Sequence, residues 1–229
     1  GLTFCDGVSA MFTLDMPWHK LDATSFAWQK ALGGEAAHGV IVLSPRAMER
    51  LNHYTPKWPI PKVLRLKNND KILEKLFLGH TLNTPSMLCI EDALDALNWA
   101  ISIGGLDSLT SRTNINQQLI RDWVRNSTWA NFFAENEDII SKTPICIKII
   151  HPFYLTMSEQ EQRNFIKEIA TILDEENVAF DIRGHMAAPP NIRLWCGPTI
   201  ESSDIKLLLT WLDFAFNEVL QKLLLKSHF

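Results

Sequence analysis

Two short apolar stretches near the start of the chain each end in a charged residue, and this pattern limits the folds open to it. Asp6 follows the stretch 2–5, and Lys30, 24 positions later, follows the stretch 24–28. Such segments predict buried strands with Asp6 and Lys30 at their carboxyl ends. Taken alone, the spacing is more typical of solvated loop residues. Strand-like and helix-like segments alternate along the rest of the chain, so the predicted fold class is α/β.

A carboxylate and a lysine at the ends of neighbouring strands suit one kind of chemistry. An enzyme that uses pyridoxal phosphate needs a lysine that bonds covalently to the cofactor aldehyde. It also needs a carboxylate that keeps the pyridinium nitrogen protonated, so that the ring accepts electrons from the substrate. Lys30 and Asp6 are therefore the candidate pair.

Five stretches around these residues strengthen that interpretation. They are 5–10 (CDGVSA), 25–30 (SFAWQK), 32–39 (LGGEAAHG), 82–87 (LNTPSM) and 192–197 (IRLWCG). Together they closely resemble the phosphoserine aminotransferase family, in the form typical of alphaproteobacteria and some archaea. The resemblance covers nearly the whole chain and is weaker around 66–79 and 130–165.

The resemblance implies a fold, a reaction and an assembly. The fold would be the C-terminal part of a fold-type I pyridoxal-phosphate transferase large domain, residues 1–105, followed by an α+β small domain, residues 106–229. The activity would be transamination between glutamate/2-oxoglutarate and phosphoserine/3-phosphohydroxypyruvate in serine biosynthesis, with a second use in pyridoxine biosynthesis. The enzyme would be a cytoplasmic homodimer with shared active sites.

The resemblance also assigns roles to individual residues. Lys30 would hold the cofactor and then move the substrate proton, Asp6 would pair with the ring nitrogen, and Gln29 would contact the cofactor. Asn83 and Thr84 would reach the cofactor phosphate of the neighbouring subunit. Other readings stay open: Asp6 as a turn residue, Gln29 as a surface amide, and Asn83 and Thr84 as capping residues.

Substrate recognition is assigned to the end of the chain. Arg193 would bind the substrate α-carboxylate, since a guanidinium offers a fixed fork for bidentate pairing; alternation along 192–196 places it on the face opposite Ile192. Many family members carry an adjacent His-Arg pair for the substrate phosphate, which this chain lacks. Arg183 or His185 could serve instead. An aminotransferase of an unphosphorylated acid such as alanine or glyoxylate therefore remains an alternative.

Composition argues against several other classes. The net charge of −4 gives no basic footprint for nucleic acid. Four scattered cysteines without a C-x-x-C pair favour neither a metal site nor a disulfide framework. No apolar run approaches the ~20 residues of a membrane span, and no secretory signal is visible.

The first residues suggest a further expectation. A core strand that begins directly after Gly1 leads us to expect that the first part of the large domain is missing. By the resemblance, that part would hold most of the cofactor phosphate and the aromatic residue that stacks on the ring. Residues 1–229 alone would then be an incomplete, inactive fragment, and a non-catalytic interaction partner is the second alternative.

The remaining pattern predicts the order of the elements. The expected strands are 39–43, buried on both faces, 145–150, 178–182 and 191–196. Five helices are expected. The first starts at Ser44-Pro45, and the second runs from Pro85-Ser86 to 102. After a bend at Gly104-Gly105 the third covers 106–126, the fourth runs from the capping box at Ser158 to 176, and the last is capped by Ser202 or Ser203. Three prolines predict an extended loop over 54–63.

Overall fold

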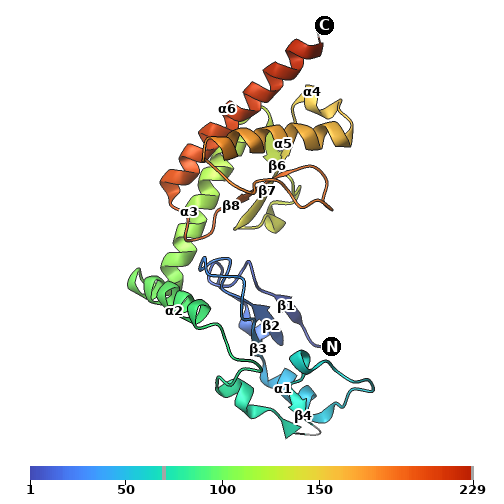
Figure 1. Ribbon diagram of the computed structural model, residues 1–229, viewed down its shortest axis with the longest axis vertical. Helices are drawn as coiled ribbons and strands as arrows, with labels where there is room; N and C mark the ends of the chain where they lie inside the picture. Colours follow the sequence, from blue (N-terminus) through green and yellow to red (C-terminus); the bar gives the residue numbers. More distant parts are fainter. Residues whose placement is uncertain (69–70, 228–229) are drawn as a thin grey trace. The chain divides into compact units, whose positions relative to one another are not determined.

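The computed structural model describes residues 1–68 and 71–227, and it divides into two compact units, Gly1–Leu106 and Asp107–Phe229 (Figure 1). The first unit contains, in order, β1 (Phe4–Asp6), η1 (Trp18–Lys20), β2 (Ala23–Phe26), β3 (Val40–Leu43), α1 (Pro45–His53), η2 (Lys62–Leu64), β4 (Lys67–Asn68), β5 (Lys71–Ile72), η3 (Glu74–Leu78) and α2 (Met87–Ser102). The second contains α3 (Gly105–Asn126, which begins just before the boundary), β6 (Ala130–Phe132), η4 (Glu137–Ile139), β7 (Pro144–Ile149), α4 (Pro152–Leu155), α5 (Glu159–Glu175), β8 (Ile192–Trp195) and α6 (Ser202–Ser227).

The first unit is built on a three-stranded sheet in the order β1-β2-β3. β1 and β2 are parallel, with Asp6 opposite Ser25, and β3 runs antiparallel to β2. The expectation that β3 is buried on both faces is wrong, because Ile41 is 53% and Val42 40% exposed. β3 is an antiparallel strand at the edge of the sheet. An antiparallel sheet can have one face exposed to solvent, and the side chains on that face are then not covered by other elements.

A buried carboxylate ties the three strands together where β2 begins. Asp22 accepts hydrogen bonds from the Thr3 backbone N–H (2.8 Å) and the Ser44 hydroxyl (2.8 Å), and it pairs with Arg46. The Arg46 hydrogen bonds hold the Asp22 pKa well below its usual range. Ser44 also caps α1 by accepting from Ala47 N–H, as predicted from the Ser-Pro pair.

The segment between α1 and α2 is mostly irregular. The predicted loop over 54–63 is free of helix as far as Pro61, but the prediction is wrong at its end, because the 3₁₀ turn η2 begins at Lys62. The small β4–β5 hairpin and η3 were not predicted. α2 begins after Ser86, whose hydroxyl accepts from Cys89 N–H. Gly104 (φ 113°) and Gly105 (φ 71°) then make the predicted bend into α3, in a backbone region open mainly to glycine.

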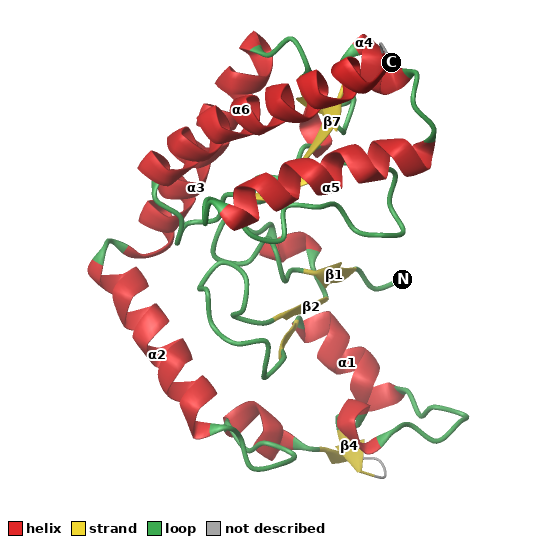
Figure 2. Cartoon of the chain, turned by 45° about the horizontal axis from the view of Figure 1, so that its top comes forward, coloured by secondary structure: helices red, strands yellow, loops and turns green. Residues whose placement is uncertain are grey.

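The second unit is an antiparallel sheet, β6-β7-β8, with α3, α5 and α6 packed against one face (Figure 2). Burial alternates along β7, where Ile145, Ile147 and Ile149 face the helices. The same alternation in β8 buries Ile192 and Leu194, as predicted. The capping box at Ser158 is present, with Glu161 as its partner.

Two predictions about the second unit are wrong. Residues 178–182 form no strand, because Asn177 (φ 56°) and Asp181 (φ 52°) adopt left-handed backbone conformations that interrupt an extended run. An isolated antiparallel bridge joins the next residue, Arg183, to Ile192. α6 already begins at Ser202, whose hydroxyl donates to the Asn116 side chain instead of capping the helix.

No helix within 1–68 and 71–227 is long and apolar enough to cross a membrane.

Candidate active site

The parallel pairing of β1 and β2 brings the two candidate catalytic segments to one edge of the sheet. Asp6 is the last residue of β1, and Lys30 lies in the turn that follows β2. The Gly7 N–H donates to the Ser25 carbonyl (2.8 Å), which continues the pairing past the strand ends. The prediction of two neighbouring strands with Asp6 at the end of the first is confirmed. Two parts of it are wrong: β1 is largely exposed, with Phe4 76% exposed, and β2 already ends at Phe26, four residues before Lys30.

Asp6 is exposed at this edge. Its Oδ1 accepts a hydrogen bond from the Val8 N–H (3.1 Å), the usual geometry of an aspartate that starts a turn. This is the one hydrogen bond of the carboxylate within the described part of the chain, so Oδ2 stays open to a ligand. The turn role and the cofactor role are therefore compatible.

The Lys30 turn is fixed by its backbone. Gly33 N–H donates to the Lys30 carbonyl and Gly34 N–H to the Trp28 carbonyl, each at 3.1 Å. Gly33 has a positive φ of 70°. A Cβ atom on Gly34 would lie 2.9 Å from Trp28 Cδ1, so only glycine allows this approach.

The loop after the turn is attached to α2. Glu35 N–H donates to Asp92 Oδ2 (3.1 Å), and the Cys89 thiol donates to the Glu35 carboxylate (3.4 Å). Ala31 and Leu32, which follow Lys30, are 2% and 5% exposed and hold the turn in the core of the unit. Lys30 itself is half-buried. The lysine therefore stands on a backbone that is held from several sides.

Three buried polar atoms close to Lys30 in sequence lack a hydrogen-bond partner among the described residues. They are Trp28 Nε1, Gln29 Oε1 and His38 Nδ1. The rings of Trp28 and His38 meet edge to face, with centroids 5.7 Å apart. A buried polar group without a partner costs roughly 1–3 kcal/mol, and such groups are typical of sites that receive a ligand or water. The unpartnered Gln29 oxygen fits a cofactor contact.

Sequence reasoning did not identify Trp28 as part of the site. No sequence signal marks Trp28, since its contact with Gly34 is visible only in three dimensions.

Asn83 and Thr84 lie in the exposed loop ahead of α2. The capping position is held by Ser86, so the alternative that the Asn-Thr pair caps this helix is wrong. The Asn83 carbonyl accepts from the Thr81 hydroxyl (2.6 Å). Both side chains are open to solvent on the first unit, where a neighbouring molecule could reach them.

Arg193 and His185 belong to the second unit. Arg193 Nη2 donates to Asp181 Oδ2 (3.0 Å), and the Arg193 side chain is 38% exposed. Asp181 was not anticipated as its partner, because it was expected to lie in a strand. The exposed His185 accepts from the Ala187 N–H through Nδ1 (3.2 Å).

A cleft of about 300 Å³ lies beside these residues. Arg163, Arg183, Asp181 and Asn191 contribute its polar lining. On one side of the cleft the Gly184 backbone packs closely against the Asn191 side chain, since a Cβ atom on Gly184 would lie 2.3 Å from Asn191 Nδ2. The cleft brings Arg183 close to the ion-paired Asp181, whereas His185 does not line it.

Known proteins with this architecture identify the class. A solved phosphoserine aminotransferase from Cytophaga hutchinsonii superposes with a TM-score of 0.72 at 22% identity, covering 93% of this chain and 55% of that chain. The fold is thus that of the C-terminal part of a fold-type I pyridoxal-phosphate-dependent aminotransferase, as predicted. No protein-family model matches the chain.

Sequence relatives narrow the class to one family. Proteins named phosphoserine aminotransferase from Methanosarcina barkeri and Methanosarcina mazei are each 46% identical over 219 residues, 96% of this chain. The chain belongs to the phosphoserine aminotransferase family. It spans 56% of the length of these relatives, or about half.

Proposed function

We propose that the chain carries the catalytic lysine of a pyridoxal-phosphate-dependent transaminase acting between glutamate/2-oxoglutarate and phosphoserine/3-phosphohydroxypyruvate. The observation that carries the proposal is the parallel β1–β2 pair, which puts Asp6 and the Lys30 turn at one edge of the sheet. The identity of 46% to relatives named for this reaction supports the substrate pair. The reaction belongs to serine biosynthesis, with a second use in pyridoxine biosynthesis, in the cytoplasm.

Lys30 and Asp6 divide the chemistry between them. Pyridoxal phosphate, when bound, supplies an electron sink for the substrate α-carbon. Lys30 would be the covalent attachment point, and its amine, once released, would move the proton from the substrate α-carbon to the C4′ carbon of the cofactor. The open Oδ2 of Asp6 holds a proton on the ring nitrogen, since a carboxylate favours the charged form of a neighbouring base.

Gln29, Asn83 and Thr84 bind the cofactor without taking part in proton transfer. The buried, unpartnered amide oxygen of Gln29 gains a donor when the cofactor is present. Asn83 and Thr84 donate to the cofactor phosphate of a second copy, as short polar side chains do well. Their exposure supports this role and implies a homodimer.

Arg193 binds the α-carboxylate that every amino-acid and keto-acid substrate presents. Its present partner Asp181 is itself a carboxylate at 3.0 Å, so a substrate carboxylate would replace one anion by another at the same guanidinium. Arg183, in the adjacent cleft, and the exposed His185 are the candidates for the substrate phosphate.

Covalent labelling tests the cofactor assignment independently of turnover. The protein is incubated with pyridoxal phosphate, reduced with borohydride and mapped by mass spectrometry. The proposal is supported if the label is found on Lys30, is lost in Lys30→Ala and is still present in Lys20→Ala, a control in the same unit. A label on another lysine would reject the assignment.

Substrate specificity needs a second measurement. The missing His-Arg pair favours comparing phosphoserine with alanine as amino donor. Faster amino transfer from phosphoserine supports the proposal, and faster transfer from alanine would favour an aminotransferase of unphosphorylated acids. Sedimentation velocity measures the proposed dimer directly.

A further inference from the structure

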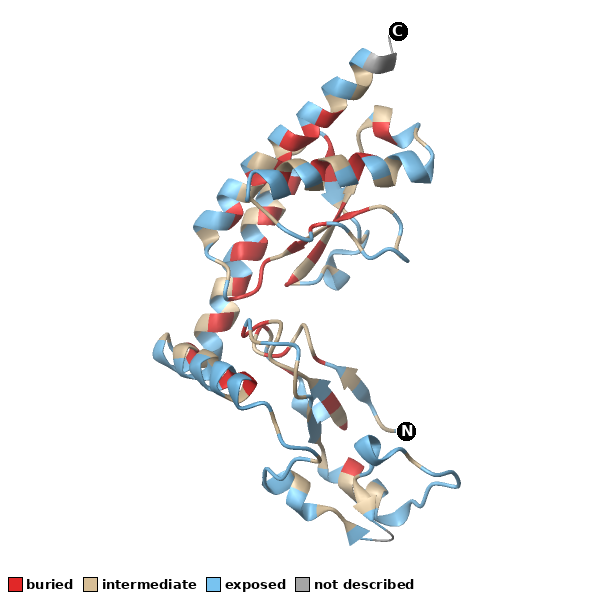
Figure 3. Ribbon diagram, in the orientation of Figure 1, coloured by how far each residue is buried: buried red, intermediate tan, exposed pale blue. Residues whose placement is uncertain are grey.

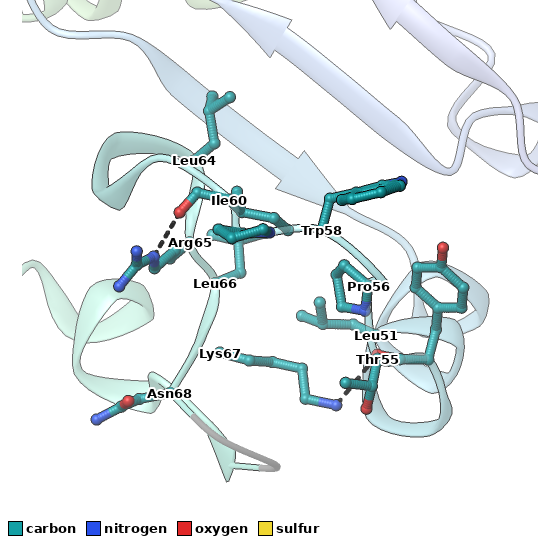
Figure 4. Close-up of a pocket in the computed structure, with 12 residues that line it drawn as sticks. Leu51, Thr55, Pro56, Trp58, Ile60, Leu64, Arg65, Leu66, Lys67 and Asn68 are labelled. Atoms are coloured by element: carbon teal, nitrogen blue, oxygen red, sulfur yellow. Dashed lines mark hydrogen bonds between the residues drawn. The ribbon is translucent and has the colours of Figure 1, made fainter.

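A second cavity lies far along the chain from Lys30, between the end of α1 and the segment that leads into β4. We call it the α1–β4 groove, and its volume is about 560 Å³ (Figure 4). Sites for small molecules typically measure roughly 300–1,000 Å³. The groove is thus large enough for a ligand of about the size of an amino acid or a fused-ring compound.

The groove has an apolar wall on a stiff loop. Its apolar lining includes Leu51, Pro56, Trp58 and Leu64. Trp58 is 81% exposed, so a large flat surface faces the solvent. The prolines at 56, 59 and 61 fix the backbone φ of this loop, and little conformational entropy is lost when a ligand binds.

Two cations border the groove, and both are held in place by backbone carbonyls. Lys67 Nζ donates to the carbonyls of Asn52 (3.1 Å) and Tyr54 (3.3 Å) at the end of α1. In Figure 4 its side chain runs across the groove toward Thr55. An ammonium group has three donors, so one remains for a ligand.

Arg65 is oriented in the same way at the other edge. Its Nε donates to the Ile60 carbonyl (2.6 Å), which fixes the plane of the guanidinium. Within the described residues its terminal nitrogens make no ion pair or hydrogen bond. A guanidinium held at Nε and open at its terminal nitrogens is well suited to an anion.

The local charge decides between a neutral and an anionic ligand. Residues 54–68 contain four Lys or Arg residues and no Asp or Glu, although the whole chain has a net charge of −4. A concave surface lined by one sign of charge attracts ligands of the opposite sign. The groove therefore favours an anion.

We propose that the α1–β4 groove binds a small molecule that combines a flat apolar body with one anionic group. The flat body lies against Trp58, with Pro56 and Leu51 beneath it. The anionic group accepts the remaining Lys67 donor and is attracted by Arg65. This site is separate from the Lys30 turn, and it does not depend on the proposed transaminase reaction.

The test uses calorimetric titration of the 229-residue chain with 2-naphthoate and with its neutral analogue 2-naphthamide. We expect saturable binding of one 2-naphthoate per chain and binding of the amide weaker by about tenfold, since the amide lacks the charge. Raising the salt from about 0.05 M to about 0.5 M should weaken 2-naphthoate binding about threefold.

Variants locate the site. Trp58→Ala should weaken 2-naphthoate binding about tenfold through the lost aromatic contact. Lys67→Met should reduce the difference in affinity between the two ligands to the part that Arg65 supplies. Trp18→Ala and Lys20→Met, at exposed positions outside the groove, should leave both affinities unchanged. Lys67→Arg is the matched control, because it keeps the positive charge and donors for the carbonyls at the end of α1. If this variant still binds 2-naphthoate, the loss in Lys67→Met is due to ligand recognition and not to local unfolding.

Several results would overturn the proposal. These are no saturable binding, equal affinity for the acid and the amide, or unchanged affinity in a folded Trp58→Ala variant. Binding that requires an acidic peptide or a lipid vesicle, with no affinity for 2-naphthoate, would also reject a small-molecule site.

Discussion

The two units differ in how they hold their shape. Among the described residues, 23 buried apolar residues lie in the second unit and eight in the first (Figure 3). The second unit packs one continuous core around Phe165, Phe216 and Trp129, whose ring stacks on Phe216 at 4.2 Å. The eight buried residues of the first unit include no aromatic side chain and are mostly small. Packing therefore stabilises the second unit far more than the first.

The candidate catalytic lysine lies in the unit with the smaller core. There, order comes from polar contacts and close backbone approaches, at Asp22 and at Gly34. Large apolar residues stay exposed on the same unit, among them Phe4 (76%) and Ile101 (71%). Exposed apolar surface of this kind commonly marks an interaction site. The difference suggests that the chemistry and the stability of the chain depend on different units.

Removing the Lys30 amine should have the largest effect and should separate chemistry from stability. In a protein of the relatives' full length that contains this chain, Lys30→Ala deletes both the covalent anchor and the proton acceptor, so transamination should fall by at least about three orders of magnitude. Hydrogen exchange of both units should stay unchanged, because the side chain is half-buried and the turn is held by backbone bonds. Loss of protection in the second unit would contradict this separation.

A core truncation should do the reverse. Phe216→Ala removes a ring that is 2% exposed and contacts Trp129, His151 and Phe165. Such substitutions cost about 3–5 kcal/mol, and denaturant unfolding followed at the second unit should show this loss. Met11→Ala, a truncation of a buried residue in the first unit, should cost about 2 kcal/mol, the low end of the range for such substitutions. Equal costs would mean that the two cores are equally well packed.

Arg193 tests whether the second unit contributes to substrate binding. Arg193→Lys keeps the charge and loses the two-pronged geometry, so kcat/KM for phosphoserine and for glutamate should each fall about tenfold. Both substrates carry the same α-carboxylate, and hence the losses should match. Asp181→Asn is the control, because it removes the ion pair and keeps the arginine. A loss confined to phosphoserine would make Arg193 a phosphate ligand.

Acid should affect the first unit first. The pKa of Asp22 is lowered by its hydrogen bonds to Arg46, so the stability that Asp22 supplies is present above its ordinary value of 3.8 and is lost as the pH falls below it. Hydrogen exchange across β1 and β2 should therefore increase in acid. Asp22→Asn should exchange faster already at pH 7 and lose this acid dependence. Asp15→Asn, at an exposed site in the same unit, should behave as the unchanged chain does.

Much of the architecture followed from the sequence where local signals were strong. The Ser44-Pro45 start, the Ser158 capping box and the Gly104-Gly105 bend depend on neighbouring residues, and each was found as predicted. The prediction of a strand over 178–182 is wrong because Asp181 adopts a positive φ. Apolar composition alone does not reveal that conformation.

The candidate site was predictable only in part. The strands that precede Asp6 and the Lys30 turn are parallel neighbours as expected, so both segments leave the sheet at the same edge. The Trp28–Gly34 contact and the Asp181 partner of Arg193 were not foreseen. The first is a contact between a side chain and the backbone, and the second is an ion pair between two side chains; no periodicity of the sequence encodes either. The roles of the site residues remain predictions.

Alkaline pH should affect the second unit through Tyr154, the smallest effect that we expect. Burial raises the pKa of Tyr154 to about 12, so the folded state favours the neutral phenol, and its stabilising effect is lost as the pH rises from about 10 toward 12. Burial likewise raises the pKa of the Cys196 thiol to about 12, and this contribution persists in Tyr154 variants.

Tyr154→Phe isolates the tyrosine. Its hydroxyl is buried without a hydrogen-bond partner among the described residues, so the variant should be as stable at pH 7 or more stable by up to about 1 kcal/mol. Denaturant unfolding at pH 7 and near pH 11 measures both effects, and the variant should lose less stability between the two. Tyr54→Phe, which alters a tyrosine that is 52% exposed in the first unit, should change neither value. A Tyr154→Phe variant that is less stable at pH 7 would mean that the hydroxyl has a partner, such as a buried water, and that polar contacts also help to hold the core of the second unit.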